Sequence, residues 1–271
     1  MAVVGTTFRV TLPDGNVLAQ DQLPGAILTL GDGSGAHRRI RIDAVEPDPR
    51  DPLGEVLLYT LSEPDAATGQ WRNACNPDPD GRRLGFPLPG MFTPDGRYVA
   101  SPGASPGASP GASPGASNGA SPGASNGASG GGVAGRILIT CTGGAEGKCV
   151  RFGYKPWRTA PDGTSLEPYY QACVRLVRAD YGGDGAGHTR NGTPIDLFDR
   201  IGIQRDETAP GMTLEAAFDP QGAVCVAHPR LPDLTSLNAL AQLYPRLAGR
   251  VGPQDCNEGV SALLFVRSVG R

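Results

Sequence analysis

The chain has 271 residues, 39% of them hydrophobic and 19% charged, and a formal net charge of −3 at pH 7. A weakly negative charge gives no long-range field that would attract nucleic acid or an anionic membrane, so the sequence predicts neither as a partner. No apolar run approaches the roughly 18 residues that a membrane-spanning helix needs. The first residues contain neither a basic nor an apolar region, so they predict no signal peptide.

The first part of the chain is predicted to be a β-rich region over residues 1–72. Four segments of β-branched or alternating residues are separated by turns rich in Pro, Gly and Asp. They cover residues 7–12, 26–30, 39–45 and 56–61. The third contains the sequence Arg-Ile-Arg-Ile, which has the period of two that a half-buried strand shows. We expect a meander whose arginine-bearing face meets water.

A low-complexity repeat interrupts the second predicted domain, residues 73–271. From residue 100 to residue 132 the chain repeats Ala-Ser-Pro-Gly or Ala-Ser-Asn-Gly. None of its side chains is an apolar group larger than that of alanine, so the repeat cannot bury enough surface to offset the entropy of ordering it. We predict that this repeat is disordered.

The rest of the second domain mixes predicted helices and strands. Residues 165–181 have apolar side chains at helical spacing, and the Thr193-Pro194 pair is typical of the start of a short helix, which Gly202 would end. A third helix is predicted over residues 236–244, before Pro245. Strands are predicted over residues 136–142, 215–219, 223–228 and 262–268. The predicted fold class is α+β: a β-rich, disulfide-bridged core with two or three short helices and a disordered low-complexity loop.

The six cysteines are predicted to form structural disulfides. They are Cys75, Cys141, Cys149, Cys173, Cys225 and Cys256. None belongs to a Cys-x-x-Cys pair and no histidine lies at a ligand-like spacing from them, so the sequence predicts no metal and no cofactor. An even number of scattered cysteines is typical of an oxidising compartment, which predicts an extracellular, periplasmic or cell-envelope location. A start codon placed too late, or a mature chain, would reconcile that location with the lack of a signal peptide.

The position of the repeat restricts the pairing of these cysteines. Six cysteines allow fifteen pairings, and the sequence does not choose among them. One cysteine, Cys75, precedes the repeat and five follow it. If all six are oxidised within one chain, Cys75 must bridge across the repeat. The repeat would then be a loop within one covalently closed unit.

Six segments together resemble the bacterial ADYC-domain family, whose function is uncharacterised and whose name comes from an Ala-Asp-Tyr-Cys signature. They are CTGGAEGKC (141–149), GYKPW (153–157), QACVRLVRADY (171–181), HTRNGTPIDLFDRIGIQ (188–204), GAVCV (222–226) and ALLFVRS (262–268). The resemblance extends more weakly to the strands before the repeat. Members of this family look exported, which agrees with the location that the cysteines predict. The resemblance carries over no catalytic residue.

The chain departs from the family pattern at two positions. Gly182 stands where the family has its signature cysteine, and Tyr244 stands where the family has a cysteine ahead of Pro-Arg-Leu. The joint loss implies that these two positions form a disulfide in other members, because the loss of one alone would leave an unpaired thiol. Introducing cysteine at both positions is therefore predicted to restore a bridge.

The catalytic candidates are His188, Asp180, Asp196 and Asp199. One histidine among several carboxylates could act as an acid and base or bind a divalent metal, so one interpretation is a hydrolase, possibly metal-dependent. Plainer roles compete with it: Asp196 fits a helix cap, and Asp199 fits the solvent face of a short helix. Only His188 and Asp180 lack an obvious structural role.

A basic run, Lys148, Arg151, Lys155 and Arg158, is interleaved with aromatic residues. Such a run is compatible with polyanion binding, but the acidic overall balance favours a packed hairpin with charged edges. The segment GYKPW could alternatively present an aromatic side chain to a protein or glycan partner. The function favoured by the sequence is an exported, non-catalytic binding or envelope module, with the hydrolase as the alternative.

Overall fold

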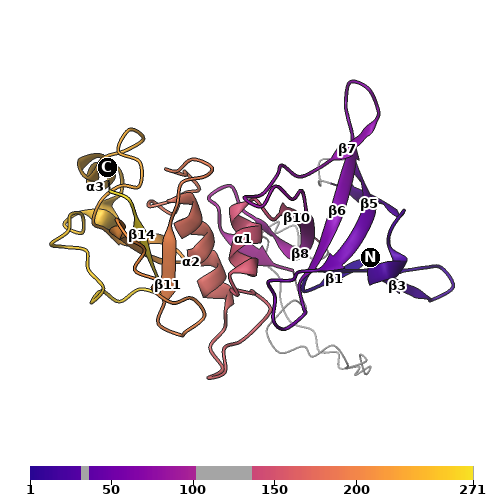
Figure 1. Ribbon diagram of the computed structural model, residues 1–271, viewed down its shortest axis with the longest axis horizontal. Coiled ribbons are helices and arrows are strands. Elements are labelled where there is room, and N and C mark those ends of the chain that lie inside the picture. The colour runs from indigo at the N-terminus through magenta and orange to yellow at the C-terminus, as the bar shows by residue number, and fades with distance from the viewer. Residues whose placement is uncertain (32–36, 102–135, 271) are drawn as a thin grey trace, which may run out of the picture.

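The computed structural model describes residues 1–31, 37–101 and 136–270. Within them the chain is β-rich, with three α-helices and three disulfides, which confirms the predicted fold class. The predicted disorder of the repeat falls almost entirely outside the described residues. Figure 1 shows helices α1 (Ala145–Arg151) and α2 (Glu167–Arg178) lying between N-terminal strands at one end and C-terminal strands at the other.

The N-terminal strands form two antiparallel sheets. A small sheet has the order β1-β2-β3, and a seven-stranded sheet has the order β10-β8-β6-β5-β4, with β7 paired to β6 and β9 paired to β8. The strands are β1 (Ala2–Val4), β2 (Thr7–Thr11), β3 (Val17–Ala19), β4 (Ile27–Gly31), β5 (His37–Pro47), β6 (Leu57–Pro64), β7 (Trp71–Asn73), β8 (Gly85–Phe92), β9 (Tyr98–Ala100) and β10 (Ile137–Cys141). A 3₁₀ turn, η1 (Gln20–Gln22), follows β3. The five strands predicted over residues 7–61 and 136–142 are confirmed as β2, β4, β5, β6 and β10.

Strand β8 was not predicted, because Pro87 and Pro89 lie within it and proline cannot donate to a ladder. The structure shows how β8 accommodates both prolines. Gly90 donates its N–H to the carbonyl of Arg136 beside β10, so the nitrogens of residues 87 and 89 face away from β10. Strand β6 pairs with β8 only at Tyr59 and Gly85, and β9 pairs with β8 only over Gly90 to Phe92. Both prolines therefore lie between these two stretches of pairing.

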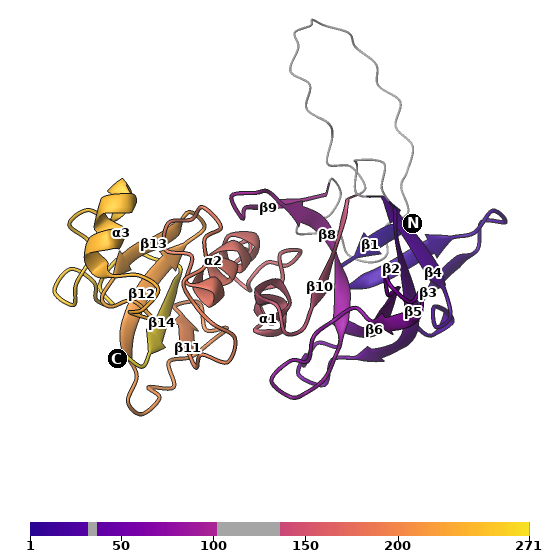
Figure 2. The same ribbon diagram turned by 90° about the horizontal axis from the view of Figure 1, so that it is seen from above.

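The C-terminal strands form a four-stranded antiparallel sheet with the order β11-β14-β12-β13. They are β11 (Asp196–Asp199), β12 (Thr213–Asp219), β13 (Gly222–Val226) and β14 (Leu264–Ser268). Helix α2 packs on β12, β13 and β14, and α1 packs on α2 and β10 (Figure 2). The strands predicted over residues 215–219, 223–228 and 262–268 are confirmed, as is the helix predicted over residues 165–181. Helix α3 (Leu237–Leu243) is also confirmed: the Ser236 hydroxyl accepts the Ala239 N–H at 3.2 Å, and the 3₁₀ turn η2 (Pro245–Leu247) follows.

The helix predicted to start at Thr193 is wrong, because residues 196–199 form strand β11, paired with β14. Both central residues of β11, Leu197 and Phe198, are buried. Neighbouring residues of a strand point to opposite faces, and each of these two packs in a different apolar cluster. After the strand, Asp199 accepts backbone N–H groups of residues 201–204 and closes a tight loop. The turn around Gly202 that resembled a helix end is this loop.

Helix α1 was not predicted either, because its segment is rich in glycine. A Cβ on Gly147 would lie 2.3 Å from the Cys141 carbonyl oxygen, so the helix can lie against the end of β10 only with glycine at this position. Glycine costs a helix about 1 kcal/mol relative to alanine, which hides α1 from sequence propensity. Cys149 of α1 forms a disulfide with Cys173 of α2, and this bond fixes the helix where it lies.

One cluster of buried apolar side chains runs through the whole described fold. It includes Phe86 of the N-terminal sheet, Tyr170 of α2 and Val266 of the C-terminal sheet. Strand β7 crosses residue 72, where the sequence places a domain boundary, and the seven-stranded sheet takes strands from both sides of it. The division into two domains stays a prediction.

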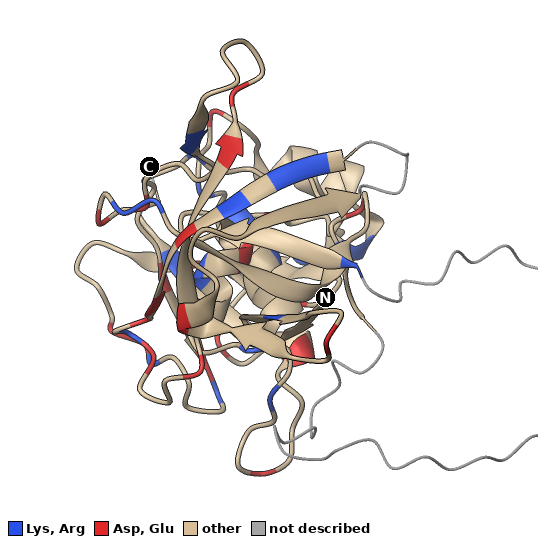
Figure 3. Cartoon of the chain, turned by 90° about the vertical axis from the view of Figure 1, so that its right-hand side faces the viewer, with Lys and Arg blue, Asp and Glu red and all other residues tan. Residues whose placement is uncertain are grey.

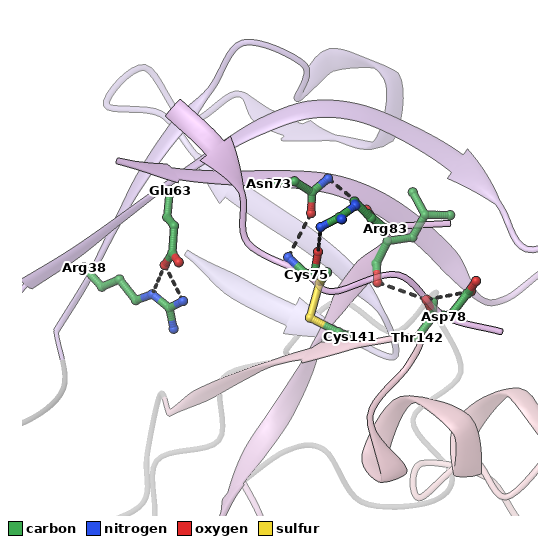
Figure 4. Close-up of a disulfide and its surroundings, with 9 residues drawn as sticks. Arg38, Glu63, Asn73, Cys75, Asp78, Arg83, Cys141 and Thr142 are labelled. Carbon is green, nitrogen blue, oxygen red and sulfur yellow. Dashed lines mark hydrogen bonds and ion pairs between the residues drawn. A yellow bond between two sulfur atoms is a disulfide. The ribbon is translucent and has the colours of Figure 1, made fainter. Parts of the chain in front are cut away.

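The structure confirms that a disulfide bridges across the repeat. Cys75 pairs with Cys141, 66 residues later, and Figure 4 shows the bond between the chain after β7 and the end of β10. Beside it Asn73 accepts the Cys75 N–H, and Thr142 donates its hydroxyl to Asp78. The third disulfide joins Cys225 and Cys256. All six cysteines are therefore paired, which indicates an oxidising compartment outside the cytoplasm. No helix in the described ranges has the length and apolar character to span a membrane.

The chain leaves the seven-stranded sheet at Ser101 and returns to it at Arg136. The Ser101 hydroxyl donates to the carbonyl oxygen of Arg136 at 2.8 Å. Both residues also bond to β8, because Ser101 donates its N–H to Pro89 and Arg136 accepts the N–H of Gly90. The two ends of segment 102–135 thus meet over adjacent residues of one strand.

Candidate functional site

A groove with a volume of about 450 Å³ runs beside α1. One wall is α1 with the residues that flank it (143–152), and the opposite wall is the loop over residues 189–195. Val177 and Arg178, at the end of α2, lie between them, and Arg230 also lines the groove. The walls belong to two of the segments that resemble the ADYC-domain family, CTGGAEGKC and HTRNGTPI.

Each wall is held by defined bonds. The disulfide between Cys149 and Cys173 fastens α1 to α2. The loop is fastened to the other end of α2, because His188 donates its N–H to the Arg178 carbonyl at 3.0 Å. Helix α2 ends at Arg178, and the next residue, Ala179, adopts a left-handed conformation with φ of 49° that turns the chain toward the loop. The groove is thus framed by fixed elements on both sides.

Two charged side chains in the groove have no partner among the residues that the structure describes. Lys148 and Glu146 both line it, and the structure shows neither side chain in a hydrogen bond or ion pair with any described residue. Arg178 is only partly engaged, donating from Nη2 to the Gly185 carbonyl at 2.7 Å. Arg190 is paired with the exposed Asp233. The groove therefore offers two cationic groups and one carboxylate to a ligand, beside apolar surface from Phe152, Val177 and Ile195.

Arg230 belongs to a buried network beneath the C-terminal end of α2. Its guanidinium donates to both carboxylate oxygens of Glu215, at 2.8 and 3.0 Å, and to the carbonyls of Leu176 and Val177. The Tyr181 hydroxyl donates to Glu215 at 2.9 Å, and burial together with the Glu215 charge raises the pKa of Tyr181 well above its usual value. Our sequence reasoning missed this network, whose one signal was a glutamate inside the apolar strand β12.

Asp180 organises the turn after α2. Its carboxylate accepts from Nη1 of Arg175 at 2.5 Å and from the N–H groups of Gly183, Asp184 and Gly185. The Asp180 side chain is about 1% exposed, so its carboxylate oxygens bond to the protein and are shielded from solvent. Asp180 also lines a smaller cavity of about 150 Å³, which shares Glu146 and Arg178 with the groove.

The other sequence candidates make no hydrogen bond or ion pair with Asp180. His188 has Nδ1 3.1 Å from the Ala179 carbonyl oxygen and packs its ring beside Tyr181, with no bond to Asp180. Asp199 binds the loop amides described above and accepts the Tyr154 hydroxyl at 2.7 Å. Burial, followed by the bond to Asp199, raises the pKa of Tyr154. Asp196 accepts the Ala209 N–H at 3.5 Å.

The structure therefore gives each carboxylate candidate a backbone or side-chain partner and does not bring the four residues into one reaction centre. No group of three or more His, Cys, Asp or Glu side chains is arranged to hold a metal ion in residues 1–31, 37–101 and 136–270. The hydrolase interpretation stays a prediction.

The basic run is a packed strap between the two halves of the molecule, and the predicted hairpin is wrong because the run spans the end of α1 and a loop. Arg151 contacts Asp48 at 2.6 Å, and Lys155 contacts Asp51 at 2.8 Å and Glu55 at 3.0 Å. All these carboxylates belong to the loop between β5 and β6, so Arg151 and Lys155 are neutralised internally, whereas Lys148 of the same run has no such partner among the described residues. Within GYKPW, Tyr154 is buried, and the half-buried Trp157 lies against Gly5.

Comparison with known proteins points to the same segments. The family model of the ADYC domain matches residues 20–232, a range that contains both walls of the groove. No curated protein and no solved structure matches the chain. The match covers well over half of the 271 residues, and the chain therefore belongs to the ADYC-domain family.

Proposed function

We propose that this protein is an exported bacterial binding module without catalytic activity, which works in the extracellular space, the periplasm or the cell envelope and holds its ligand in the groove beside α1. The observation that carries the proposal is the state of Lys148 and Glu146. Both side chains line the groove, and neither makes a hydrogen bond or ion pair with a described residue. Charged groups placed in a concave site without an intramolecular partner are available to a ligand.

The lining of the groove favours one kind of ligand. Lys148 and Arg178 attract an anionic group, and Phe152, Val177 and Ile195 favour an apolar part beside it. The carboxylate candidates for catalysis, by contrast, make bonds that hold loops and strand ends. The disulfides support the proposed location, because such bonds persist in exported proteins.

The test is a binding screen with purified, oxidised protein on arrays of glycans and short peptides. We expect saturable binding to ligands with an anionic group, weakened by at least about tenfold in Lys148→Glu, since loss of a charge-assisted bond and a new repulsion act together. Arg250→Glu is the matched control, because it makes the same change of charge at an exposed residue of the C-terminal end. Its affinity is expected to stay within about twofold of the wild type.

The same experiment separates the two functional interpretations. Bound ligand is recovered and weighed by mass spectrometry, and a binding module returns it unchanged. Recovery of cleaved ligand would support the hydrolase alternative. Equal affinity of Lys148→Glu and wild-type protein would show that the ligand binds elsewhere and would overturn the proposed site.

A further inference from the structure

A second surface, at the opposite end of the molecule, combines arginine and tryptophan side chains. Arg39 and Arg41 are two residues apart on β5 and so project from the same face of the sheet. Their guanidinium carbons lie 5.5 and 4.8 Å from the centre of the Trp71 ring, which β7 supplies from across β6. Figure 3 looks onto this end and shows basic residues gathered along one strand of the large sheet.

The edge strand β4 extends this face. Thr29 pairs with Arg39 and Ile27 pairs with Arg41, and directly opposed residues share a face of the sheet. Ile27 is 46% exposed, so it adds apolar surface beside the two arginines. We call the set formed by Ile27, Thr29, Arg39, Arg41 and Trp71 the arginine–tryptophan face.

The two arginines differ in what they bind. Arg41 donates from Nε to Asp43 at 2.5 Å, whereas Arg39 is exposed and has no carboxylate partner among the described residues. Arg38 and Arg72, by contrast, both pair with Glu63. Stacking on an indole ring orients a guanidinium so that its N–H edge stays free, and that edge matches the two oxygens of a carboxylate. Arg39 is therefore an oriented cation without a carboxylate partner among the described residues.

A carboxylate-bearing sugar matches this combination of groups. Such a sugar would offer ring carbons to Ile27 and the edge of Trp71, a hydroxyl to Thr29 and a carboxylate to the N–H edge of Arg39. The negative net charge of the chain opposes unspecific attraction of anions, so affinity has to come from this local geometry. We propose that the arginine–tryptophan face binds polysaccharides built from uronic acids, independently of the groove beside α1.

The experiment uses Trp71 as its own reporter. The chain has two tryptophans, Trp71 and Trp157, so the Trp157→Phe protein emits only from the proposed face. Titration with oligogalacturonate is expected to change this emission saturably, and a neutral maltooligosaccharide of equal length is expected to leave it unchanged. Arg39→Ser in the same background is expected to raise the Kd by about tenfold, the effect of losing one charge-assisted bidentate contact.

Arg72→Ser is the matched control. Residue 72 follows Trp71 on β7 and therefore projects from the other face of the strand, yet the substitution removes the same charge. Its Kd is expected to stay within about twofold of the parent protein. Ile27→Ser tests the apolar part without disturbing Trp71 and is expected to weaken binding. No emission change with oligogalacturonate, or an equal loss of affinity in Arg39→Ser and Arg72→Ser, would overturn the proposal.

Discussion

Gly182 and Tyr244 occupy one space between the turn after α2 and the end of α3. A Cβ on Gly182 would lie 2.1 Å from Cε1 of Tyr244, far inside van der Waals contact. The backbone of Gly182 is not left-handed, and the three atoms nearest to an added Cβ all belong to the tyrosine ring. The ring is held in place, because the Tyr244 hydroxyl donates to Asp184 at 3.1 Å. This contact agrees with the inference that the two positions carry a disulfide in other family members.

We expect Gly182→Ala to lower the free energy of unfolding by about 1–3 kcal/mol, because the added methyl group overpacks the site. Urea denaturation measures the loss, and Gly182→Ala combined with Tyr244→Ala is expected to recover part of it. Replacing both residues by cysteine is expected to form a disulfide on oxidative refolding, detected by peptide mapping without reductant. Free thiols in that double variant would contradict the inferred bridge.

At the scale of the elements, the strap, taken here as residues 151–158 of the basic run, connects α1 with the loop between β5 and β6. Arg151 and Asp48 are 9% and 1% exposed in their side chains, and Lys155 and Asp51 are each 6% exposed. Buried ion pairs add little net stability relative to an apolar contact, but the loss of one partner leaves an uncompensated charge. The strap therefore acts chiefly by permitting one arrangement of α1 on the loop between β5 and β6.

We expect Asp51→Asn to lower the free energy of unfolding at neutral pH by about 2–4 kcal/mol, since Lys155 would keep only Glu55 as a partner. Burial alone would raise the pKa of Asp51, but bonds from Lys155 and from the Val56 and Glu55 amides outweigh it and lower the pKa below 3.8. The unfolded chain therefore takes up this proton first as the pH falls. The stabilisation by Asp51 is complete above its unfolded pKa and is lost as the pH drops through the lower folded value.

Urea denaturation near pH 7 and at about pH 3 tests this dependence. The wild type is expected to lose more stability between the two conditions than Asp51→Asn does. The exposed Asp21 provides a control, because Asp21→Asn removes a carboxylate that makes no side-chain bond in the described structure. Equal pH dependence in all three proteins would show that Asp51 does not contribute to it.

The elements that sequence predicts are those with a local pattern. Ile40 and Ile42 alternate with polar residues and define β5, and Ser236 with Pro245 brackets α3. The missed elements depend on contacts that are distant in sequence. Strand β8 tolerates Pro87 and Pro89 because they lie between its pairing with β6 and its pairing with β9. Helix α1 needs Gly147 because a side chain there would clash with the Cys141 carbonyl. The groove could not be predicted for the same reason, since its walls meet only through α2 and a disulfide whose pairing the sequence left open.

At the scale of the whole molecule, the disulfide between Cys75 and Cys141 makes the two sides of the repeat one covalent unit. It closes a loop of 66 residues, and both cysteines flank strands of the same sheet. A long closed loop removes many conformations from the unfolded chain, so this bond constrains the unfolded state more than a short-range one would.

We expect the double substitution of Cys75 and Cys141 by serine to lower the free energy of unfolding by about 4 kcal/mol in the chain-entropy estimate. Thermal denaturation of oxidised protein measures the effect, with mass spectrometry to verify that the remaining two disulfides are intact. Unchanged stability, or peptide mapping that finds Cys75 bonded to another cysteine, would contradict the bridge seen here.

The bond between Ser101 and Arg136 has a consequence for the length of the repeat. Because both anchor points are set by β8, the sheet places no condition on how many Ala-Ser-Pro-Gly units lie between them. Whole Ala-Ser-Pro-Gly units could therefore be added or removed between Ser101 and Arg136 while the strand registers on either side stay the same.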